Sequence, residues 1–389
     1  SKEQYFDIFI HPIQWGNTGW INEDDEERKW IDQTIEKTIP YIQQGGHFDY
    51  SLQVTIPNEW QRIATTNIGY TAGIETTKVA PVWLQKANEN VNKIIVVSEH
   101  AKNTYQNTTA TAVNEKTGQQ LDYPLTVPIT TVNYPVKHFQ EIPELDLNLS
   151  TDFNFLVIAQ FGPRKNLENT IKWFIEEFHD DNVGLLLKSN FAKNCTMDRQ
   201  KMMSDLKIIT NQYPDRKCKL YLLHGDMSDN EIHSLYKHEK LSAFLALPHG
   251  EGFGLPIFEA AYSGMPVVTI PWSGQNDYLI DSEGTHCYEV SYDLQPVQDN
   301  VVWENVLIKE SMWAYPREQS AKRMMRQCYN DITNKVEGTI ADKAPEYAEV
   351  LKERFSAKEM YEKFVDCILP TQDLKEIESE IDALLADLL

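Results

Sequence analysis

Two glutamates, Glu251 and Glu259, flank a glycine-rich turn in the segment HGEGFGLPIFEAAYSGMPVV, residues 249–268. The apolar run LSAFLALP precedes the turn and is typical of a buried strand. Pro256 and Gly264 mark the two ends of a helix, because proline suits the first helical position and glycine the residue after the last. The segment therefore predicts a strand, a glycine loop and a helix, with a carboxylate on each side of the loop.

This arrangement suits a ligand that carries a phosphate between two hydroxyl-bearing groups. In an open α/β sheet the ligand crevice lies at the carboxyl ends of the strands, where this loop is expected. Glycines let the backbone approach a ligand, and the N–H groups of the first helical turn favour a phosphate. A carboxylate beside a phosphate is unfavourable unless it accepts hydrogen bonds from hydroxyl groups. A nucleotide sugar has this layout, with sugar hydroxyls, a diphosphate and a ribose diol in series.

The string E-G-F-G-L-P-x-x-E resembles the E-x7-E segment of retaining glycosyltransferases of family 4, which have the two-domain B-type glycosyltransferase fold. The resemblance implies that Glu251 faces the donor sugar and that Glu259 binds the ribose hydroxyls. The turn that holds the donor would consist of Gly252, Phe253, Gly254 and Leu255. The alternative interpretation is an acidic loop followed by a helix-start acid that the helix dipole favours.

A pair of cations, Arg164 and Lys165, follows the first predicted strand of the second half, in AQFGPRKNLENT. The resemblance implies that both bind the donor diphosphate and that they act catalytically with Glu251. In the family the arginine more often lies five residues before the lysine, where this chain has Gln160, so the arginine position departs from the commoner pattern. A solvated basic turn is the alternative.

Three further segments carry candidate site residues by the same resemblance. Backbone groups in LLHGDMSDNEIHSLYKH would receive the nucleobase, at Leu223, His224 and Gly225. A glycine loop near the N-terminus would approach the diphosphate, at Gly16 and Gly19. Glu75, at a predicted strand end, is the acceptor-side candidate. A surface role for His224, a simple turn for the glycines and a helix-start role for Glu75 are the alternatives.

The chain offers no convincing D-x-D pair for a metal. Asp180 and Asp181 lie at a predicted helix end, and the EDDEE run near residue 25 is typical of a solvated helix start. We therefore expect no cofactor and no metal, with the donor, a UDP-sugar or a GDP-sugar, as the bound nucleotide. The cations would stabilise the charge on the leaving diphosphate.

The elements that must position these residues form two series in which strands and helices alternate, which favours parallel sheets and an α/β fold. We expect the first series to run as strand 5–13, helix 26–42, strands 48–56 and 68–74, helix 82–90, strand 93–98 and helix 99–107. The second is expected as strand 153–161, helix 166–179, strand 183–189, helix 196–213, strand 218–225, helix 228–240, strand 241–248, helix 256–264 and strand 265–272, with a helical tail from about Trp303.

The resulting fold class is α/β, with two Rossmann-like doubly wound domains that face each other across a cleft. We predict an acceptor-side domain over residues 1–138, a donor domain over 139–345, a helix over 346–369 that crosses back to the first domain, and a terminal amphipathic helix over 370–389. In the last segment five apolar residues recur every three or four positions. This helix would dock on the body of the protein, and self-association through it into a homo-oligomer is the alternative.

Composition narrows the class of partner. The 389 residues carry a formal net charge of -22, which disfavours DNA, RNA and anionic lipid as main partners. No apolar run reaches the roughly 18 residues of a membrane span, and the N-terminus does not resemble a signal peptide. Five scattered cysteines form no C-x-x-C pair, which favours free thiols in a reducing compartment. We therefore expect a cytoplasmic protein.

The resemblance implies transfer of a hexose from a nucleoside-diphosphate sugar to an acceptor hydroxyl with retention of the anomeric configuration, UDP being favoured over GDP on family frequency. Two other functions stay open. One is a nucleotide-sugar-binding subunit without turnover, which would tend to have lost Glu251, Glu259 or Lys165. The other is a nucleotide-sugar epimerase on the same fold. Glycan, lipid-linked and protein acceptors are all compatible with the sequence.

Overall fold

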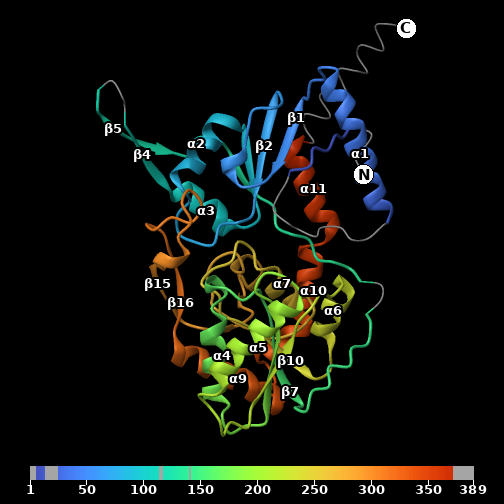
Figure 1. Cartoon of the computed structure of the whole chain (residues 1–389), viewed down its shortest axis with the longest axis vertical. Coiled ribbons are helices and arrows are strands. Elements are labelled where there is room, and N and C mark those ends of the chain that lie inside the picture. The colour runs from blue at the N-terminus through green and yellow to red at the C-terminus, as the bar shows by residue number, and fades with distance from the viewer. Residues whose placement is uncertain (1–5, 14–24, 114–116, 140–141, 371–389) are drawn as a thin grey trace.

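The structure is a computed structural model that describes residues 6–13, 25–113, 117–139 and 142–370. Within these ranges the chain forms two α/β domains, each built on its own parallel sheet (Figure 1). The two Rossmann-like domains predicted from the sequence are therefore present. The predicted residues Gly16 and Gly19, and the predicted amphipathic helix after Pro370, lie outside the described ranges.

The first sheet has the strand order β1-β2-β3-β6, and all its pairs are parallel. Its strands are β1 (Tyr50–Val54), β2 (Thr66–Thr71), β3 (Lys93–Val96) and β6 (Ile129–Thr131). The domain also contains α1 (Glu26–Gln43), η1 (Pro57–Glu59), α2 (Pro81–Asn90), α3 (Glu99–Asn107) and a hairpin of β4 (Thr109–Val113) and β5 (Gln120–Pro124). The Ser98 side chain caps α3 by accepting from the Ala101 N–H, as a serine before a helix is expected to do.

The second sheet has the order β14-β11-β10-β7-β8-β9, again with parallel pairs. Its strands are β7 (Phe153–Ile158), β8 (Val183–Lys188), β9 (Lys219–Leu223), β10 (Leu241–Ala246), β11 (Val267–Thr269) and β14 (Tyr288–Glu289). The accompanying helices are η2 (Pro163–Lys165), α4 (Leu167–Glu177), α5 (Thr196–Thr210), α6 (Asp229–Lys237), α7 (Leu255–Tyr262), α8 (Asn276–Leu279) and α9 (Glu318–Thr333). These bounds follow the predicted second series closely.

Helices cover both faces of this second sheet. Phe155 belongs to the cluster that includes buried residues of α4 and α9, whereas the next residue, Leu156, belongs to the cluster with buried residues of α6 and α7. Successive strand residues point to opposite faces, so a strand covered on both sides must be apolar throughout. The runs FNFLVI and VGLLLK meet this requirement, which is why they could be recognised as central strands.

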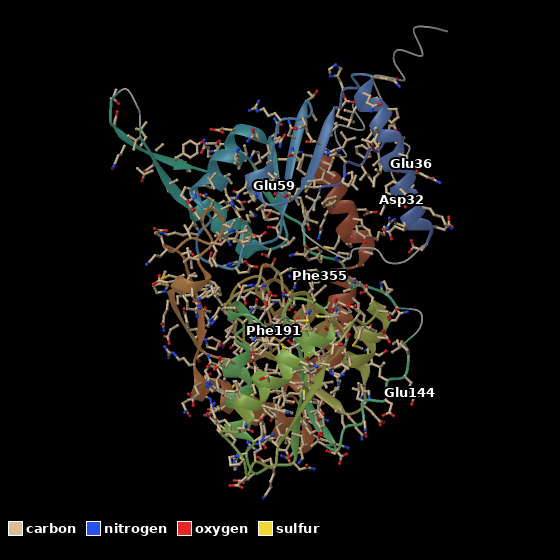
Figure 2. The ribbon with its side chains drawn as sticks, viewed as in Figure 1. Asp32, Glu36, Glu59, Glu144, Phe191 and Phe355 are labelled. Atoms are coloured by element: carbon tan, nitrogen blue, oxygen red, sulfur yellow. The ribbon has the colours of Figure 1, made fainter. Side chains whose placement is uncertain are left out.

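Besides the chain segment that leads from β6 to β7, two regions on opposite sides of the molecule join the domains (Figure 1). The first consists of α10 (Ile340–Arg354) and α11 (Ala357–Ile368), and Figure 2 shows Phe355 where the chain passes between the domains. Phe355 packs against Phe258 of α7, and its carbonyl accepts from the Val136 N–H at 2.8 Å. α11 then lies on the first sheet, where Lys93 Nζ donates to the Cys367 carbonyl at 2.6 Å.

The second connection is the hairpin of β15 (Tyr292–Pro296) and β16 (Met312–Pro316), with η3 (Asp299–Val301) in its long loop. Trp83 of α2 donates from Nε1 to the Asn305 carbonyl at 2.8 Å. The Thr77 N–H donates to the Met312 carbonyl at 2.9 Å. The short pair β12 (Ile280–Asp281) and β13 (Gly284–Thr285) completes the strands of the described ranges.

Two sequence predictions about elements are wrong. Residues 6–13 form no strand; instead the Ile10 N–H donates to Thr38 Oγ1 and Phe9 stacks on Tyr41, both in α1. The helical tail does not start near Trp303, because the chain first makes the β16 strand and enters a helix only at Glu318. The sequence pattern predicted neither hairpin.

Candidate functional site

The glycine-rich loop connects β10 to α7 at the carboxyl edge of the second sheet. Gly254 has a φ of +85° and immediately precedes α7, so the chain enters the helix through a left-handed residue that favours glycine. The helix starts at Leu255, and Pro256 is in its first turn. Of the predicted turn residues, Leu255 is exposed, whereas the Phe253 ring is buried against Tyr134 and Phe258.

Backbone from the first domain lies directly on this loop. A Cβ atom at Gly250 would lie 2.1 Å from the Glu75 carbonyl oxygen, and one at Gly252 would lie 2.0 Å from the Ala72 carbonyl oxygen. Only glycine allows backbone segments to approach so closely. The segment that follows β2 and the loop that follows β10 therefore form one contact between the domains.

Four charged side chains meet at this contact. Glu251 accepts from Arg164 Nη1 at 2.9 Å and from Lys165 Nζ at 2.5 Å, and its side chain is only 9% exposed. Arg164 Nη1 also donates to the Gly250 carbonyl at 2.8 Å. Glu75 approaches from the first domain, with Oε1 at 3.6 Å from Arg164 Nε. The structure thus brings together all three predicted catalytic residues and the predicted acceptor-side residue.

The pKa values of the two acids in this cluster are shifted in opposite directions. Burial raises the pKa of Glu251, but Arg164 and Lys165 outweigh it, so the pKa lies below its ordinary value. Burial also raises the pKa of Glu75, with Glu251 adding to the rise and Arg164 opposing it, and here burial prevails. The pKa of Arg164 is raised because the two carboxylates outweigh its own burial. Arg164 and Glu251 are therefore both charged at neutral pH.

Glu259 lies in α7, in different surroundings from Glu251. Its carboxylate accepts from the Tyr236 hydroxyl at 3.0 Å. Burial raises its pKa, while the Tyr236 hydrogen bond and the more distant Lys137 oppose the rise. The motif therefore contains one carboxylate held by two cations and one held by a hydroxyl group.

The predicted nucleobase segment follows β9 and is fixed by side-chain contacts. His224 Nε2 lies 2.9 Å from Asp198 Oδ1, and the His224 side chain is 3% exposed, so it is not a surface histidine. Asp198 also accepts from three backbone N–H groups, those of Phe191, Ala192 and Lys193. The Leu223 carbonyl accepts from the Ser189 N–H at 3.2 Å.

Two residues beside the site were not predicted from the sequence. Lys188 ends β8, and its Nζ donates to the Gly225 carbonyl; burial lowers its pKa, with Asp226 opposing. His100 packs edge-on against Trp272, and burial lowers its pKa to about 4, which leaves a neutral imidazole. A cation at the end of an otherwise apolar strand was a usable signal for Lys188. No comparable signal marks His100.

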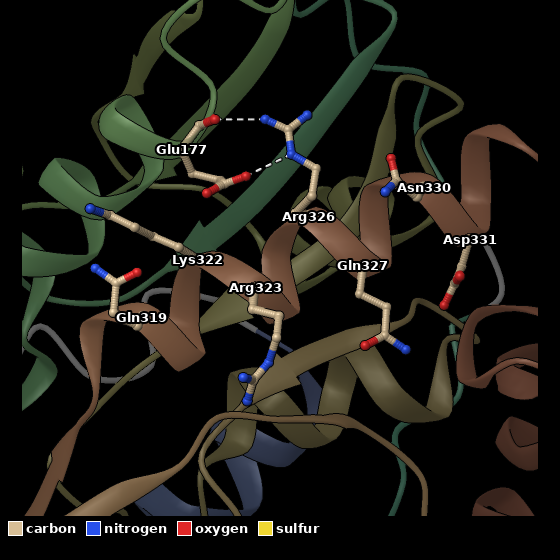
Figure 3. A pocket seen from close by; sticks show the side chains of 8 residues that line it. All are labelled: Glu177, Gln319, Lys322, Arg323, Arg326, Gln327, Asn330 and Asp331. Carbon is tan, nitrogen blue, oxygen red and sulfur yellow. Dashed lines mark hydrogen bonds and ion pairs between the residues drawn. The ribbon is translucent and has the colours of Figure 1, made fainter.

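Two hollows differ in their relation to this cluster. A narrow pocket beside Lys165 and Glu251 is lined by residues of β7, β10 and the first turn of α7. A second hollow, of about 420 Å³, lies along α9 beside Glu177 of α4 (Figure 3). Of its three lining cations, Lys322 and Arg326 pair with acids of α4 and the turn after it. The hollow contains none of the predicted site residues, so it is not the candidate site.

Metal ligands, cysteine pairing and membrane-spanning helices also bear on the predicted class of protein. Among these residues no three His, Cys, Asp or Glu side chains are grouped so that they could hold a metal ion. All five cysteines are free. No helix within the same ranges has both the length and the apolar character that a membrane crossing requires.

Comparisons with known proteins agree with this architecture. Residues 218–294, which include β9, the glycine loop and α7, match the family of glycosyl transferases group 1. No curated protein matches the chain significantly. Among solved structures, sucrose-phosphate synthase from Thermosynechococcus elongatus is similar with a TM-score of 0.54 at 12% identity, over 92% of this chain and 80% of that one. At such identity the likeness concerns the fold.

Two further structures extend the comparison. An α,α-trehalose-phosphate synthase (UDP-forming) from Burkholderia vietnamiensis has a TM-score of 0.50 at 9% identity, over 78% of this chain and 65% of that one. A TarM variant from S. aureus has a TM-score of 0.45 at 15% identity, over 78% of this chain and 51% of that one. This chain thus spans about half the length of TarM.

The fold is that of the two-domain, Rossmann-like glycosyltransferases. The matched segment lies in the second domain, which corresponds to the domain predicted to hold the donor. The matched segment and the fold together support a glycosyltransferase of this B-type class.

Proposed function

We propose that the protein is a retaining glycosyltransferase similar to family 4. It moves a hexose from a nucleoside-diphosphate sugar, UDP being favoured over GDP, to an acceptor hydroxyl, and it needs no metal ion. The second domain holds the donor and the first shapes the acceptor side. The activity is assigned to the cytoplasm.

The observation that carries this proposal is the Arg164, Lys165 and Glu251 cluster beside the N-terminus of α7. Two cations at the carboxyl edge of a parallel sheet suit a diphosphate, and the N–H groups of α7 add partial positive charge. As the glycosidic bond breaks, negative charge grows on the leaving diphosphate. Charges that are already in position stabilise that state without reorganisation.

Glu251 and Glu259 would then bind the two ends of the donor. Glu251 lies in the loop, beside the cations, where the sugar joins the diphosphate. Glu259 already accepts a hydroxyl hydrogen bond, and a ribose diol offers the same kind of donor. Leu223, His224 and Gly225 would lie beside the base through their backbone. No protein group is assigned as general base, since by family resemblance the leaving phosphate takes the acceptor proton.

Incubation with labelled UDP- and GDP-sugars tests the proposal. A thermal-shift panel first identifies the donor, because a ligand that binds the folded state raises the melting temperature. We expect labelled sugar to pass to an acceptor, or slowly to water, with the nucleoside diphosphate released. Tight binding with no release would indicate a non-catalytic subunit. An isomerised donor would indicate an epimerase.

A further inference from the structure

Arg164 is shared between the two domains. Its Nη1 donates to Glu251 at 2.9 Å within the second domain, while its Nε lies 3.6 Å from Oε1 of Glu75 in the first. Lys165, by contrast, is paired with Glu251 alone among the described acids within salt-bridge distance. Arg164 is therefore the cation through which the donor domain and the acceptor-side domain are electrostatically connected.

The two contacts of Arg164 differ in strength. At 2.9 Å the Glu251 contact is a charge-assisted hydrogen bond, reinforced by the second cation on the same carboxylate. At 3.6 Å the Glu75 contact is an ion pair without a hydrogen bond. A ligand that needs Arg164 therefore displaces Glu75 before it displaces Glu251.

When Glu75 is ionised, the cluster carries no net charge before any ligand arrives. Two carboxylates and two cations meet within a contact where Glu75 is 23% exposed and Glu251 is 9% exposed. A nucleoside diphosphate adds at least two negative charges to this small volume. In partly buried surroundings, where charges interact more strongly than in water, the added charge repels the acid that is least firmly held.

We propose that Glu75 and the donor diphosphate compete for Arg164, so that filling the donor site releases Glu75 toward the acceptor side. Glu75 is then a positioning residue for Arg164 in the empty enzyme, and after release its carboxyl group is available to an acceptor hydroxyl. This inference rests on the proposed function, because it requires a diphosphate at Arg164 and Lys165.

Release of Glu75 also changes its protonation. Burial and Glu251 raise the pKa of Glu75, and Arg164 opposes the rise more strongly than Lys165 does. His100, the nearby neutral imidazole, is hydrogen-bonded to the Thr76 backbone and adds no charge. Because the Glu75 backbone lies against Gly250, the carboxyl group freed from Arg164 stays in this buried contact, where burial and Glu251 are then less opposed. Binding of the diphosphate is therefore accompanied by proton uptake at Glu75.

Calorimetric titration of the full chain with UDP and with GDP tests the competition. Glu75→Gln keeps the shape and removes the competing charge, so we expect the dissociation constant to fall by roughly threefold to tenfold, the factor for a partly screened charge at this distance. Glu99→Gln is the matched control, because Glu99 is an acid of the same domain that pairs with Lys102 at the surface. It should leave the dissociation constant unchanged.

Titrations near pH 6 in buffers of different ionisation enthalpy give the second readout. The nucleotide's terminal phosphate titrates in this range, so the informative quantity is the difference between variants. Wild type and Glu75→Asp should take up more protons than Glu75→Gln. If Glu75→Gln bound the nucleotide no more tightly than wild type and took up as many protons, the competition would be overturned but the proposed function would not. Failure of wild type to bind either nucleotide would overturn the proposed function as well.

Discussion

Glu251 and Glu259 belong to one short motif, yet the protein places them in opposite electrostatic environments. Glu251 is held by Arg164 and Lys165, which lower its pKa against the effect of burial. Glu259 meets the Tyr236 hydroxyl, and burial raises its pKa. The same residue type thus has its pKa lowered at one end of the loop and raised at the other.

The difference shows what the helix and the loop each contribute. The loop places Glu251 at the sheet edge, where the turn after β7 delivers two cations. The helix places Glu259 against α6, whose Tyr236 is buried. A carboxylate amid cations suits the region where charge develops, whereas a carboxylate beside a hydroxyl suits recognition of a neutral diol. Within the proposed function, this difference favours catalysis at the Glu251 end of the motif and binding at the Glu259 end.

The strongest test removes a cation from the Glu251 end. Lys165→Ala should lower the turnover number by about two orders of magnitude or more, the scale of a lost oxyanion-type donor, because Lys165 acts on charge that grows as the bond breaks. Donor affinity should fall by less. Steady-state kinetics at saturating donor measures both, and Lys172→Ala, a surface lysine paired with Glu168, is the control. A normal turnover number with only a raised Michaelis constant would limit Lys165 to ground-state binding.

A stability comparison tests the electrostatic difference directly. Glu251→Gln leaves two cations without their carboxylate and should lower the free energy of unfolding by about 1–3 kcal/mol at pH 7. Because the folded pKa of Glu251 is depressed, its contribution exists above the ordinary value of 4.5 and is lost as the pH falls through the folded pKa. The deficit of the variant should therefore shrink in acid. Denaturant titrations at several pH values measure it.

Glu259→Gln should show the reverse pH dependence. Its folded pKa is raised, so ionisation of Glu259 costs stability as the pH rises above 4.5 through the folded value. The glutamine that replaces Glu259 cannot ionise. The free energy of unfolding of the variant should therefore rise relative to that of the wild type between acid and neutral pH. The same denaturant titrations measure the change. A deficit that grows with pH would show that Glu259 is held as firmly as Glu251.

Nucleotide binding sharpens the same comparison at the Glu259 end. Glu259→Gln should weaken binding of the nucleoside diphosphate by about tenfold to a hundredfold, the scale of one hydrogen bond to a charged group, with little change in fold. Calorimetric titration measures the affinity, and Glu168→Gln, an exposed acid of α4, is the control. Unchanged affinity would remove Glu259 from the ribose site.

The fold was predictable where local pattern and packing agree. Central strands such as β7 and β8 are apolar on both faces, and β10, the glycine loop and α7 carry their own start and stop residues. The error at residues 6–13 arose because an apolar run alone does not reveal whether a strand neighbour exists; Phe9 packs on α1 instead. The β15–β16 hairpin was missed because its two strands are separated by a long loop that packs on Trp83 of the other domain.

The sequence predicted which residues form the site, but not which of them contact one another. The family resemblance implied Arg164, Lys165 and Glu251 as site residues, and all three meet in the structure. The contact of Glu75 with Arg164 depends on how the domains approach each other, which no local pattern specifies. The surroundings of Glu259 depend on Tyr236 of a different helix, so its raised pKa could not be foreseen.

The smallest expected effect concerns metal ions. If Arg164 and Lys165 supply the positive charge that the leaving diphosphate requires, a divalent cation at the same place has no separate role. Chelation with EDTA should then leave the turnover number of the wild type unchanged, and added Mg²⁺ or Mn²⁺ should not raise it. The test bears on the Glu251 end of the motif alone. A metal ion between the diphosphate and Glu251 would supply part of the charge stabilisation that is proposed for Lys165. A turnover that EDTA abolishes and Mg²⁺ restores would overturn the proposed role of the two cations.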